Sequence, residues 1–409
     1  MGIRDSYGEL VLPPAVILGL SVTSLGVVRS LGRRGIKVIG IDHKKNQIGS
    51  FSKYCEALIC PKPGRAESDL LDFMESLAHR FVDNVVLIPT NDEFVLFLSR
   101  NRKNLSQYYK FLLASEELIE GLNNKSEVVR IAEKQGMQFP KTICPRNIDE
   151  VICFSDQIQY PCVIKPAFGY LYDELKFKAV LATNRSELIE IYKKYHKYSE
   201  KLVIQEFVSG KDDAQFSYAA YFNAESEPLA TFTARKIRQI PPVFGTGTLV
   251  AICHEPKVEQ IGTPFLRKIK YRGIAEIEFK KDAKNGSFKM IEVNTRIWTQ
   301  NNLAERCGID MTYIAYNDIL GRPFNGTSKK EQNIQWINVY DDFFACFGAL
   351  GYFKRGEITF TRWLKSLFSQ NEHAVFATDD LRPFVESTKA FLIRVAESIG
   401  KTIRSLGNT

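Results

Sequence analysis

The chain has 409 residues and a formal net charge of +8, with 44% hydrophobic and 25% charged residues. This length allows roughly two to four domains, and this composition is that of an ordinary globular protein. No apolar run reaches about 18 residues, no signal-peptide layout occurs and no Lys/Arg block is present, which argues against membrane-spanning, secreted and nucleic-acid-binding classes. We therefore expect a cytoplasmic protein with no nucleic-acid partner, in which a basic cleft favours small anions such as nucleotides.

The N-terminal region alternates strand and helix patterns. Ala15–Gly19 and Ile36–Asp42 are short apolar runs typical of buried strands, and the segment between them has helical periodicity. This order predicts a right-handed βαβ unit. The spacing from Gly19 to Gly26 is not Gly-x-Gly-x-x-Gly, so we do not favour a dinucleotide site with Asp42 on the ribose. A dinucleotide-dependent oxidoreductase is the alternative for this unit.

A further strand is predicted at Val85–Pro89, and the polar residues Thr90–Glu93 follow it directly. Open α/β sheets place ligands at the carboxyl ends of their strands, so this cluster could contribute to a substrate pocket. It could equally cap the helix that begins near Phe94. The following region, Glu116–Gln135, has a helical pattern.

The middle of the chain contains cations in strand-like surroundings. Lys165 interrupts the apolar run Tyr160–Pro166, and a lysine there is costly unless it faces a cleft or a partner. Later, Arg235 and Arg238 precede a proline-stiffened turn and the loop Gly245–Thr248. Converging backbone amides and guanidinium groups suit a carboxylate or phosphate, and a solvated basic strand edge is the alternative.

Two strand patterns, Gly273–Lys280 and Lys289–Arg296, flank the turn signal Asn285-Gly286, which predicts a hairpin. Because side chains alternate along a strand, one face carries the polar residues of the second strand, namely Glu292, Asn294 and Arg296. The first strand adds Glu276 and Glu278. Oxygen ligands without His or Cys suit Mg²⁺ or Mn²⁺, and we favour this interpretation over a solvated acidic face for Glu278, Glu292 and Asn294 together. For Glu276 alone we favour the solvated face.

This hairpin resembles the metal-binding end of the ATP-grasp superfamily, whose members activate a carboxylate with ATP and join it to a nucleophile, most often an amine. In the family, one metal carboxylate precedes an aromatic residue, as Glu278 precedes Phe279 here. A Glu-x-Asn follows on the next strand, matched by Glu292 and Asn294, and an arginine two residues later, matched by Arg296, steadies the acyl phosphate.

The resemblance implies a nucleotide site as well. Lys125 and Lys165 match the two lysines that reach the ATP phosphates. The stretch Gln205–Val208 resembles the linker that holds adenine through the backbone at Glu206 and Val208. Asp212 or Asp213 would then reach the ribose hydroxyls, and Arg235 and Arg238 would contact the substrate or acyl phosphate. The alternative for the linker is a plain strand with a Ser-Gly turn.

The loop at 167–178 departs from the family because bulky residues replace the usual Gly- and Ser-rich sequence. In this it resembles a branch of carboxylate–amine ligases related to D-aspartate ligase. The expected function is an ATP- and Mg²⁺-dependent (or Mn²⁺-dependent) ligase that joins a small carboxylate to a small amine through an acyl phosphate. A non-catalytic ATP-binding regulatory or scaffold protein is the alternative. The identities of both substrates stay open.

The expected fold is α/β, with α+β character in the ATP-binding part: a Rossmann-like pre-ATP-grasp domain at 1–115, an ATP-grasp domain at 116–325 and a C-terminal helical, aromatic extension at 326–409. The ATP-grasp subdomains are placed at 116–204 and 209–325, joined by the linker 205–208. Near the C-terminus, Phe391, Val395, Ile399 and Ile403 recur at helical spacing. This stripe suits docking on the protein's own core or in a homodimer better than membrane-surface contact.

Overall fold

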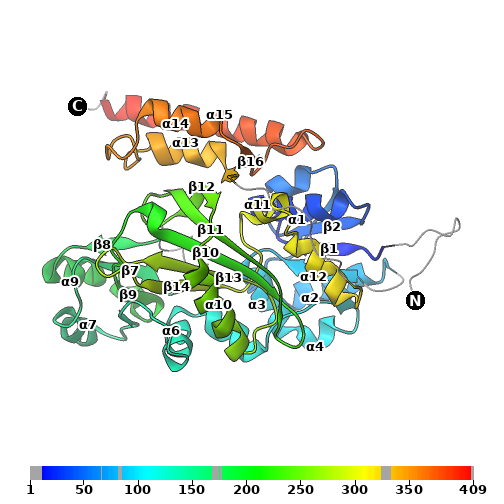
Figure 1. Cartoon of the computed structure of the whole chain (residues 1–409), viewed down its shortest axis with the longest axis horizontal. Coiled ribbons are helices and arrows are strands. Elements are labelled where there is room, and N and C mark those ends of the chain that lie inside the picture. Colours follow the sequence, from blue (N-terminus) through cyan, green and yellow to red (C-terminus); the bar gives the residue numbers. More distant parts are fainter. Residues whose placement is uncertain are drawn as a thin grey trace, which may run out of the picture.

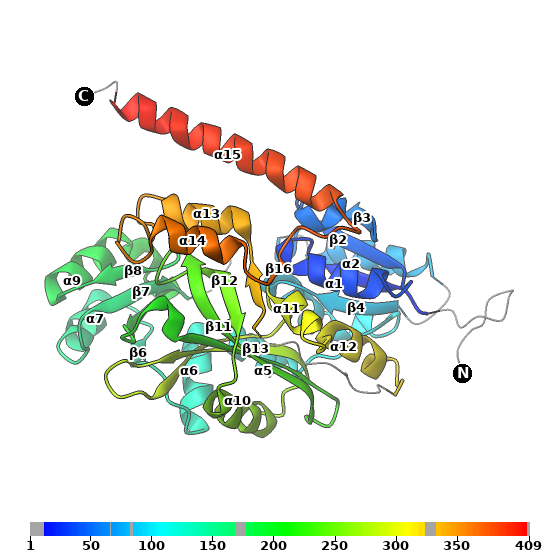
Figure 2. The same cartoon turned by 45° about the horizontal axis from the view of Figure 1, so that its top comes forward.

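The computed structural model describes residues 12–65, 67–81, 85–167, 175, 177–323 and 333–406. Three sheets organise the described residues. Most of the predicted loop 167–178 lies outside the described residues. The mixed α/β architecture agrees with the expected fold class. Figures 1 and 2 show the four- and seven-stranded sheets side by side, the N-terminal sheet at the opposite end, and a layer of C-terminal helices over one side.

The N-terminal sheet is parallel, with strand order β3-β2-β1-β4-β5. Its strands are β1 (Ala15–Leu18), β2 (Val38–Asp42), β3 (Cys55–Ile59), β4 (Val85–Pro89) and β5 (Tyr109–Lys110). Its helices are α1 (Val22–Gly32), η1 (Ile48–Phe51), α2 (Glu67–Ala78), α3 (Asp92–Arg100) and α4 (Arg102–Leu105). β1 and β2 are buried throughout, as apolar strands covered on both faces should be.

The carboxyl ends of β1 and β4 meet closely. Gly19 has a φ of +92°, and a Cβ atom there would lie 2.6 Å from Asn91 Nδ2 and 2.8 Å from Thr90 Oγ1. Only glycine fits this turn without a shift of its neighbours. The predicted polar cluster after β4 therefore lies beside the carboxyl end of β1, the central strand of the sheet.

A four-stranded antiparallel sheet follows, with order β6-β9-β7-β8. Its strands are β6 (Thr142–Ile143), β7 (Cys162–Pro166), β8 (Val180–Ala182) and β9 (Leu202–Glu206). The associated helices are α5 (Glu116–Asn123), α6 (Lys125–Lys134), α7 (Ile148–Ser155), α9 (Arg185–Lys194) and η3 (His196–Lys201). The predicted helical region Glu116–Gln135 is thus two helices, because Asn124 ends α5 and its side chain accepts a hydrogen bond from Ser126 N–H to cap α6.

The largest sheet has seven strands in the order β14-β13-β10-β11-β12-β15-β16. They are β10 (Gln215–Phe222), β11 (Pro228–Ile240), β12 (Thr246–Ile252), β13 (Gly273–Lys281), β14 (Phe288–Asn294), β15 (Gln335–Ile337) and β16 (Asn371–His373). Along the chain, the short helix η4 (Asp212–Ala214) comes directly before β10, and α10 (Pro256–Lys268) comes between β12 and β13. The helices α11 (Asn301–Arg306) and α12 (Met311–Ile319) follow β14. β15 and β16 come from the predicted C-terminal extension, so this segment continues the sheet.

The C-terminal helices are α13 (Val339–Phe347), α14 (Phe360–Leu367) and α15 (Arg382–Leu406). Figure 2 shows α15 starting beside the N-terminal sheet and running over α13 and α14. Phe391 lies 5.3 Å from the ring of Phe343 on α13, which supports docking on the protein's own core for this part of the predicted stripe. Of the described helices, none is both long and apolar enough to cross a membrane.

Candidate active site

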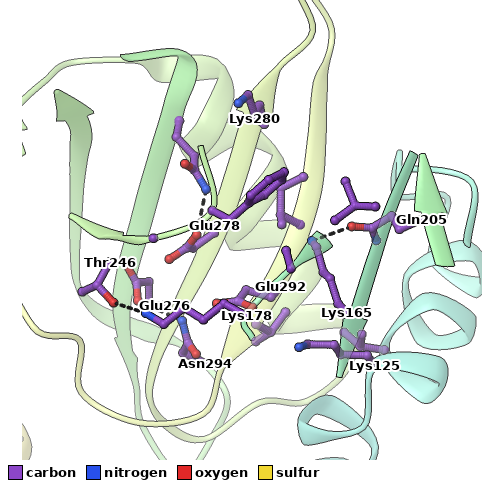
Figure 3. Close-up of a pocket in the computed structure, with 18 of the residues that line it drawn as sticks. Lys125, Lys165, Lys178, Gln205, Thr246, Glu276, Glu278, Lys280, Glu292 and Asn294 are labelled. Carbon is purple, nitrogen blue, oxygen red and sulfur yellow. Dashed lines mark hydrogen bonds between the residues drawn. The ribbon is translucent and has the colours of Figure 1, made fainter. Parts of the chain in front are cut away.

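A cavity of about 360 Å³ opens between the four-stranded and seven-stranded sheets. Figure 3 shows side chains from both sheets pointing into it. Among the described residues, its charged lining consists of six cations and five carboxylates: Lys125, Lys165, Lys178, Lys236, Lys280, Arg296, Asp92, Glu206, Glu276, Glu278 and Glu292. Such a volume is within the range of small-molecule sites, and the density of cations suits an anionic ligand.

The β13–β14 hairpin supplies the acidic wall. Glu278 stands directly opposite Glu292, and Glu276 stands opposite Asn294. The register shifts just beyond Glu278, where Phe279 pairs with Met290 and leaves Ile291 as an extra residue. Asn294 Nδ2 donates to Glu276 Oε2 at 3.0 Å. The predicted side chains therefore share one face, and Glu276, for which we favoured a solvated face, lines the cavity with them.

The pKa values of the two facing carboxylates are shifted in opposite directions. Burial raises the pKa of Glu278 to about 7; Lys236 opposes this shift, and the carboxylates of Glu292 and Glu276 add to it. Lys236 Nζ lies 2.9 Å from both oxygens of Glu278. Burial also disfavours the ionised form of Glu292, but Lys125, Lys236 and Lys165 outweigh it and lower that pKa.

This donor set fits a divalent cation that takes its remaining ligands from phosphate. Within the described ranges, no three His, Cys, Asp or Glu side chains converge closely enough to hold a metal ion by themselves. Mg²⁺, however, is usually bound by one or two carboxylates together with phosphate oxygens and water. Glu278, Glu292 and the amide oxygen of Asn294 match that mode.

Two half-buried lysines face the acidic wall: Lys125 is the first residue of α6, and Lys165 lies on β7 of the four-stranded sheet. Lys125 Nζ donates to the Pro166 carbonyl at 2.8 Å, and Lys165 Nζ donates to Gln205 Oε1 at 2.8 Å. Burial, together with the neighbouring Lys125, lowers the pKa of Lys165 to about 8, and burial also lowers the pKa of Lys125. An anion placed between these ammonium groups would offset the cost of holding both charges in the cavity.

The predicted linker residues Gln205, Glu206 and Val208 also line the cavity, beside Phe207. The side chain of Glu206 is engaged, since Lys289 Nζ lies 3.0 Å from its Oε2. The family resemblance predicts that the backbone of Glu206, at the end of β9, contacts adenine, and this prediction does not involve its side chain.

Arg296 joins the cavity to the N-terminal sheet. Its Nε donates to Asp92 Oδ1 at 2.8 Å, and its Nη2 donates to Asn294 Oδ1 at 3.3 Å. Asn91 accepts a hydrogen bond from Phe94 N–H at 3.0 Å, so it caps α3. The cluster after β4 therefore has both features we considered: Asn91 caps the helix, and Asp92 lines the cavity.

Arg235 and Arg238, predicted to contact the substrate, do not line the cavity, and we correct that prediction. Arg235 points to the opposite side, where it borders a separate hollow with His254. Arg238 is buried in an ion pair with Asp342, in which its Nε and Nη2 each lie 2.8 Å from a carboxylate oxygen. The register shift between Lys236 and Arg238 leaves Ile237 as an extra residue, and Lys236 is the cation of this stretch that lines the cavity.

Asp212 and Asp213, predicted to reach the ribose, also lie outside the cavity lining. The Asp212 carboxylate accepts hydrogen bonds from Val243 N–H at 3.1 and 3.2 Å and from the Tyr352 hydroxyl. Asp213 borders the separate hollow with Arg235. The prediction that Asp212 or Asp213 contacts the ribose is therefore wrong for this cavity.

Three lysines that the sequence analysis did not assign complete the cavity. Lys236 pairs with Glu278, Lys178 Nζ donates to Thr246 Oγ1 at 3.3 Å, and Lys280 lies near Phe207. The alternation of β13 places Lys280 on the face of Glu276 and Glu278, and this signal could have identified it.

Comparison with known proteins finds similar sequences over much of the chain. Residues 256–324 match the family model "Carbamoyl-phosphate synthase L chain, ATP binding domain". The chain is 22% identical over 345 residues to D-aspartate ligase of Enterococcus faecium, covering 79% of this chain and 82% of that protein. It is 27% identical over 231 residues to the carbamoyl phosphate synthase large chain of Pyrococcus furiosus, covering 52% of this chain and 20% of that protein.

Solved structures resemble the fold at low sequence identity. N5-carboxyaminoimidazole ribonucleotide synthetase from Thermus thermophilus aligns with a TM-score of 0.61 and 16% identity, covering 78% of this chain and 81% of that one. L-amino acid ligase from Bacillus licheniformis aligns with a TM-score of 0.58 and 17% identity, covering 76% and 75%. These likenesses concern the fold, and the chemistry must be argued from the side chains in the cavity.

Proposed function

We propose that the chain is a member of the ATP-grasp superfamily and acts as an ATP-dependent carboxylate–amine ligase that forms an amide bond and releases ADP and phosphate. One observation carries the proposal. Glu278 and Glu292 face each other in a cavity whose opposite wall holds Lys125 and Lys165, so carboxylates and ammonium groups flank a space that fits a polyphosphate.

The proposed reaction has two steps. An oxygen of the substrate carboxylate attacks the γ-phosphorus of ATP, the bond to the β-phosphate oxygen breaks, and ADP and an acyl phosphate form. The amine nitrogen then attacks the carbonyl carbon, the bond from that carbon to the phosphate-bearing oxygen breaks, phosphate leaves, and the nitrogen loses a proton. Catalysis here is mainly positioning and charge neutralisation.

The residues have separate proposed roles. Lys125 and Lys165 would hold the phosphates, the backbone of Glu206 and Val208 would hold adenine, and Gln205 would fix the Lys165 ammonium through its 2.8 Å hydrogen bond. Glu278, Glu292 and Asn294 would hold Mg²⁺ or Mn²⁺, which when bound draws negative charge from the phosphate oxygens.

Two cations would act on the substrate. Arg296 and Lys236 line the cavity next to the acidic wall, and each already pairs with a carboxylate. Their fixed positions would orient a substrate carboxylate toward the phosphate and would stabilise charge that develops on the acyl phosphate. Lys236 would thus make the contact with the substrate or acyl phosphate that was predicted for Arg235 and Arg238.

The substrates are proposed as an amino acid and a second small molecule. D-aspartate ligase is similar over most of both chains, so D-aspartate is the first candidate to test. ADP release should be measured with Mg²⁺·ATP, D-aspartate, pooled amino acids and fractions of a small-molecule extract. Release that requires both a carboxylate and an amine supports the ligase.

The matched variant for this assay is Glu292→Gln, which keeps the shape of the side chain but removes a proposed metal ligand. We expect it to abolish ADP release with the fold intact. Near-normal ADP release by this variant would contradict the metal assignment. Binding of ATP without ADP release in every substrate pool would instead favour a non-catalytic ATP-binding regulatory or scaffold protein.

A further inference from the structure

The turn between β11 and β12 forms part of the cavity wall. Together with the first two residues of β12 it forms the segment 241–247, whose cavity-lining residues are Val243, Phe244, Gly245, Thr246 and Gly247. Phe244 lies edge-on to Phe207 of the linker, with ring centroids 6.0 Å apart. This turn therefore borders the end of the cavity at which adenine recognition is proposed.

The backbone of this turn is in an unusual conformation. Val243 has a φ of +78°, which is rare for a residue branched at Cβ. Such conformations persist only where surrounding contacts determine them, and they are often found at functional sites. The contacts that hold Val243 therefore decide whether the wall keeps its shape.

A buried carboxylate provides the support. Asp212, 6% exposed, accepts the Val243 N–H at 3.1 and 3.2 Å. The hydroxyl of Tyr352, 4% exposed, donates to the same carboxylate and accepts the Gln239 N–H at 3.0 Å. Gln239 Oε1 in turn accepts the Gly245 N–H at 3.1 Å. These bonds connect both ends of the turn to one tyrosine hydroxyl.

Tyr352 is itself fixed in the C-terminal segment, 140 residues from Asp212 in the sequence. Its N–H donates to the Ala345 carbonyl of α13 at 3.1 Å, and its carbonyl accepts the Glu357 N–H at 3.0 Å. Burial and the Asp212 carboxylate raise the pKa of Tyr352, so the hydroxyl keeps its proton and continues to donate. The C-terminal segment thus reaches the cavity wall through one side chain.

We propose that Tyr352 is a positioning residue of this site: through Asp212 and Gln239 it holds the turn at 241–247 in the shape that closes the nucleotide end of the cavity. The C-terminal segment is then an integral part of the active site. The consequence for nucleotide affinity rests on the proposed function, whereas the consequence for the shape of the turn rests on the hydrogen bonds alone.

The test compares Tyr352→Phe with Tyr340→Phe, each of which removes one hydroxyl. Tyr340 is a suitable control because its hydroxyl bonds to Thr388 between α13 and α15 and does not contact the turn. Hydrogen exchange of the Val243 and Gly245 amides is measured in both variants, with the amides of β13 as a check on the fold. The affinity for Mg²⁺ with a non-hydrolysable ATP analogue is measured by titration.

In Tyr352→Phe we expect about tenfold faster exchange of both turn amides and about tenfold weaker binding of the analogue, with neither change in Tyr340→Phe. Exchange rates that match in the two variants would overturn the positioning role. Faster exchange with unchanged analogue affinity would overturn the link to the nucleotide end. The exchange result stands even if the wild-type protein releases no ADP, so failure of the ligase proposal is distinguished from failure of this inference.

Discussion

Replacing Asp342 by alanine should destabilise the protein more than any other change to the C-terminal segment that we consider. Its carboxylate is fully buried and accepts hydrogen bonds from Arg238 Nε and Nη2 at 2.8 Å, from Thr248 Oγ1 at 2.8 Å and from Trp363 Nε1 at 3.0 Å, with Cys346 Sγ at 4.0 Å. Removing it leaves the Arg238 guanidinium buried without its countercharge.

The expected loss of unfolding free energy is about 3–5 kcal/mol, the cost of removing one partner of a buried ion pair. The adjacent Asp341 gives a matched control. Its side chain is 41% exposed and lies 3.7 Å from Arg394, so Asp341→Ala should cost about 1 kcal/mol or less. The contrast between neighbouring aspartates isolates the buried contact from any general effect on α13.

Urea unfolding monitored by tryptophan fluorescence suits this comparison because Trp363 belongs to the same cluster. The midpoint of the first transition should fall clearly in Asp342→Ala and remain near the wild-type value in Asp341→Ala. Equal, small shifts in the two variants would refute the buried ion pair. Arg238 would then be available for the substrate contact that its sequence position suggested.

Two further predictions concern the cavity. Lys236→Met should lower the rate of ADP release by about 10²–10³-fold, because Lys236 lines the cavity. The control Arg235→Met changes the preceding residue, which borders the separate hollow, and should have little effect on that rate. Similar losses of rate in the two variants would contradict the placement of these side chains. The pKa of Lys165 is lowered to about 8, and its protonated form should bind phosphate. The affinity for an ATP analogue, measured by titration, should therefore fall by up to about tenfold for each pH unit above 8. This slope should flatten in Lys165→Met, and an equally steep slope in that variant would assign the titration to another group.

The acidic hairpin was predictable because its information is local. The Asn285-Gly286 turn predicts that the two strands pair, and the period-two spacing places Glu276 and Glu278 on one face of the first strand and Glu292 and Asn294 on one face of the second. The exact pairing of Glu278 with Glu292 depends on the extra residue Ile291, which the sequence pattern does not indicate. Lys165 was predictable for a similar reason, since a lysine in an apolar strand must face a cleft or a polar partner. The parallel N-terminal sheet followed from apolar runs separated by helical patterns.

The basic stretch before Pro241 was not predictable in the same way. An extra residue, Ile237, shifts the register of β11, so simple alternation does not tell which cation enters the cavity. The partner that holds Arg238 is Asp342, 104 residues later. A contact at that separation leaves no local pattern in the sequence.

The role of Asp212 was also not predictable from the local sequence. An acid shortly after the linker residue Val208 matched the family position for a ribose contact, and nothing nearby indicated another role. Its actual partners are Val243 and Tyr352, which only the folded chain brings to it. Sequence patterns thus identified the walls of the cavity, whereas long-range hydrogen bonds decided which polar residues are exposed to it.

The most direct test of the proposed chemistry follows oxygen atoms. The protein is incubated with Mg²⁺·ATP, an amine-containing extract and amino acids labelled with ¹⁸O in their carboxylates, and the released phosphate is analysed by mass spectrometry. A ligase that forms an acyl phosphate transfers one carboxylate oxygen to each phosphate, so we expect singly labelled phosphate in proportion to ADP. ADP release with unlabelled phosphate would contradict the acyl-phosphate mechanism.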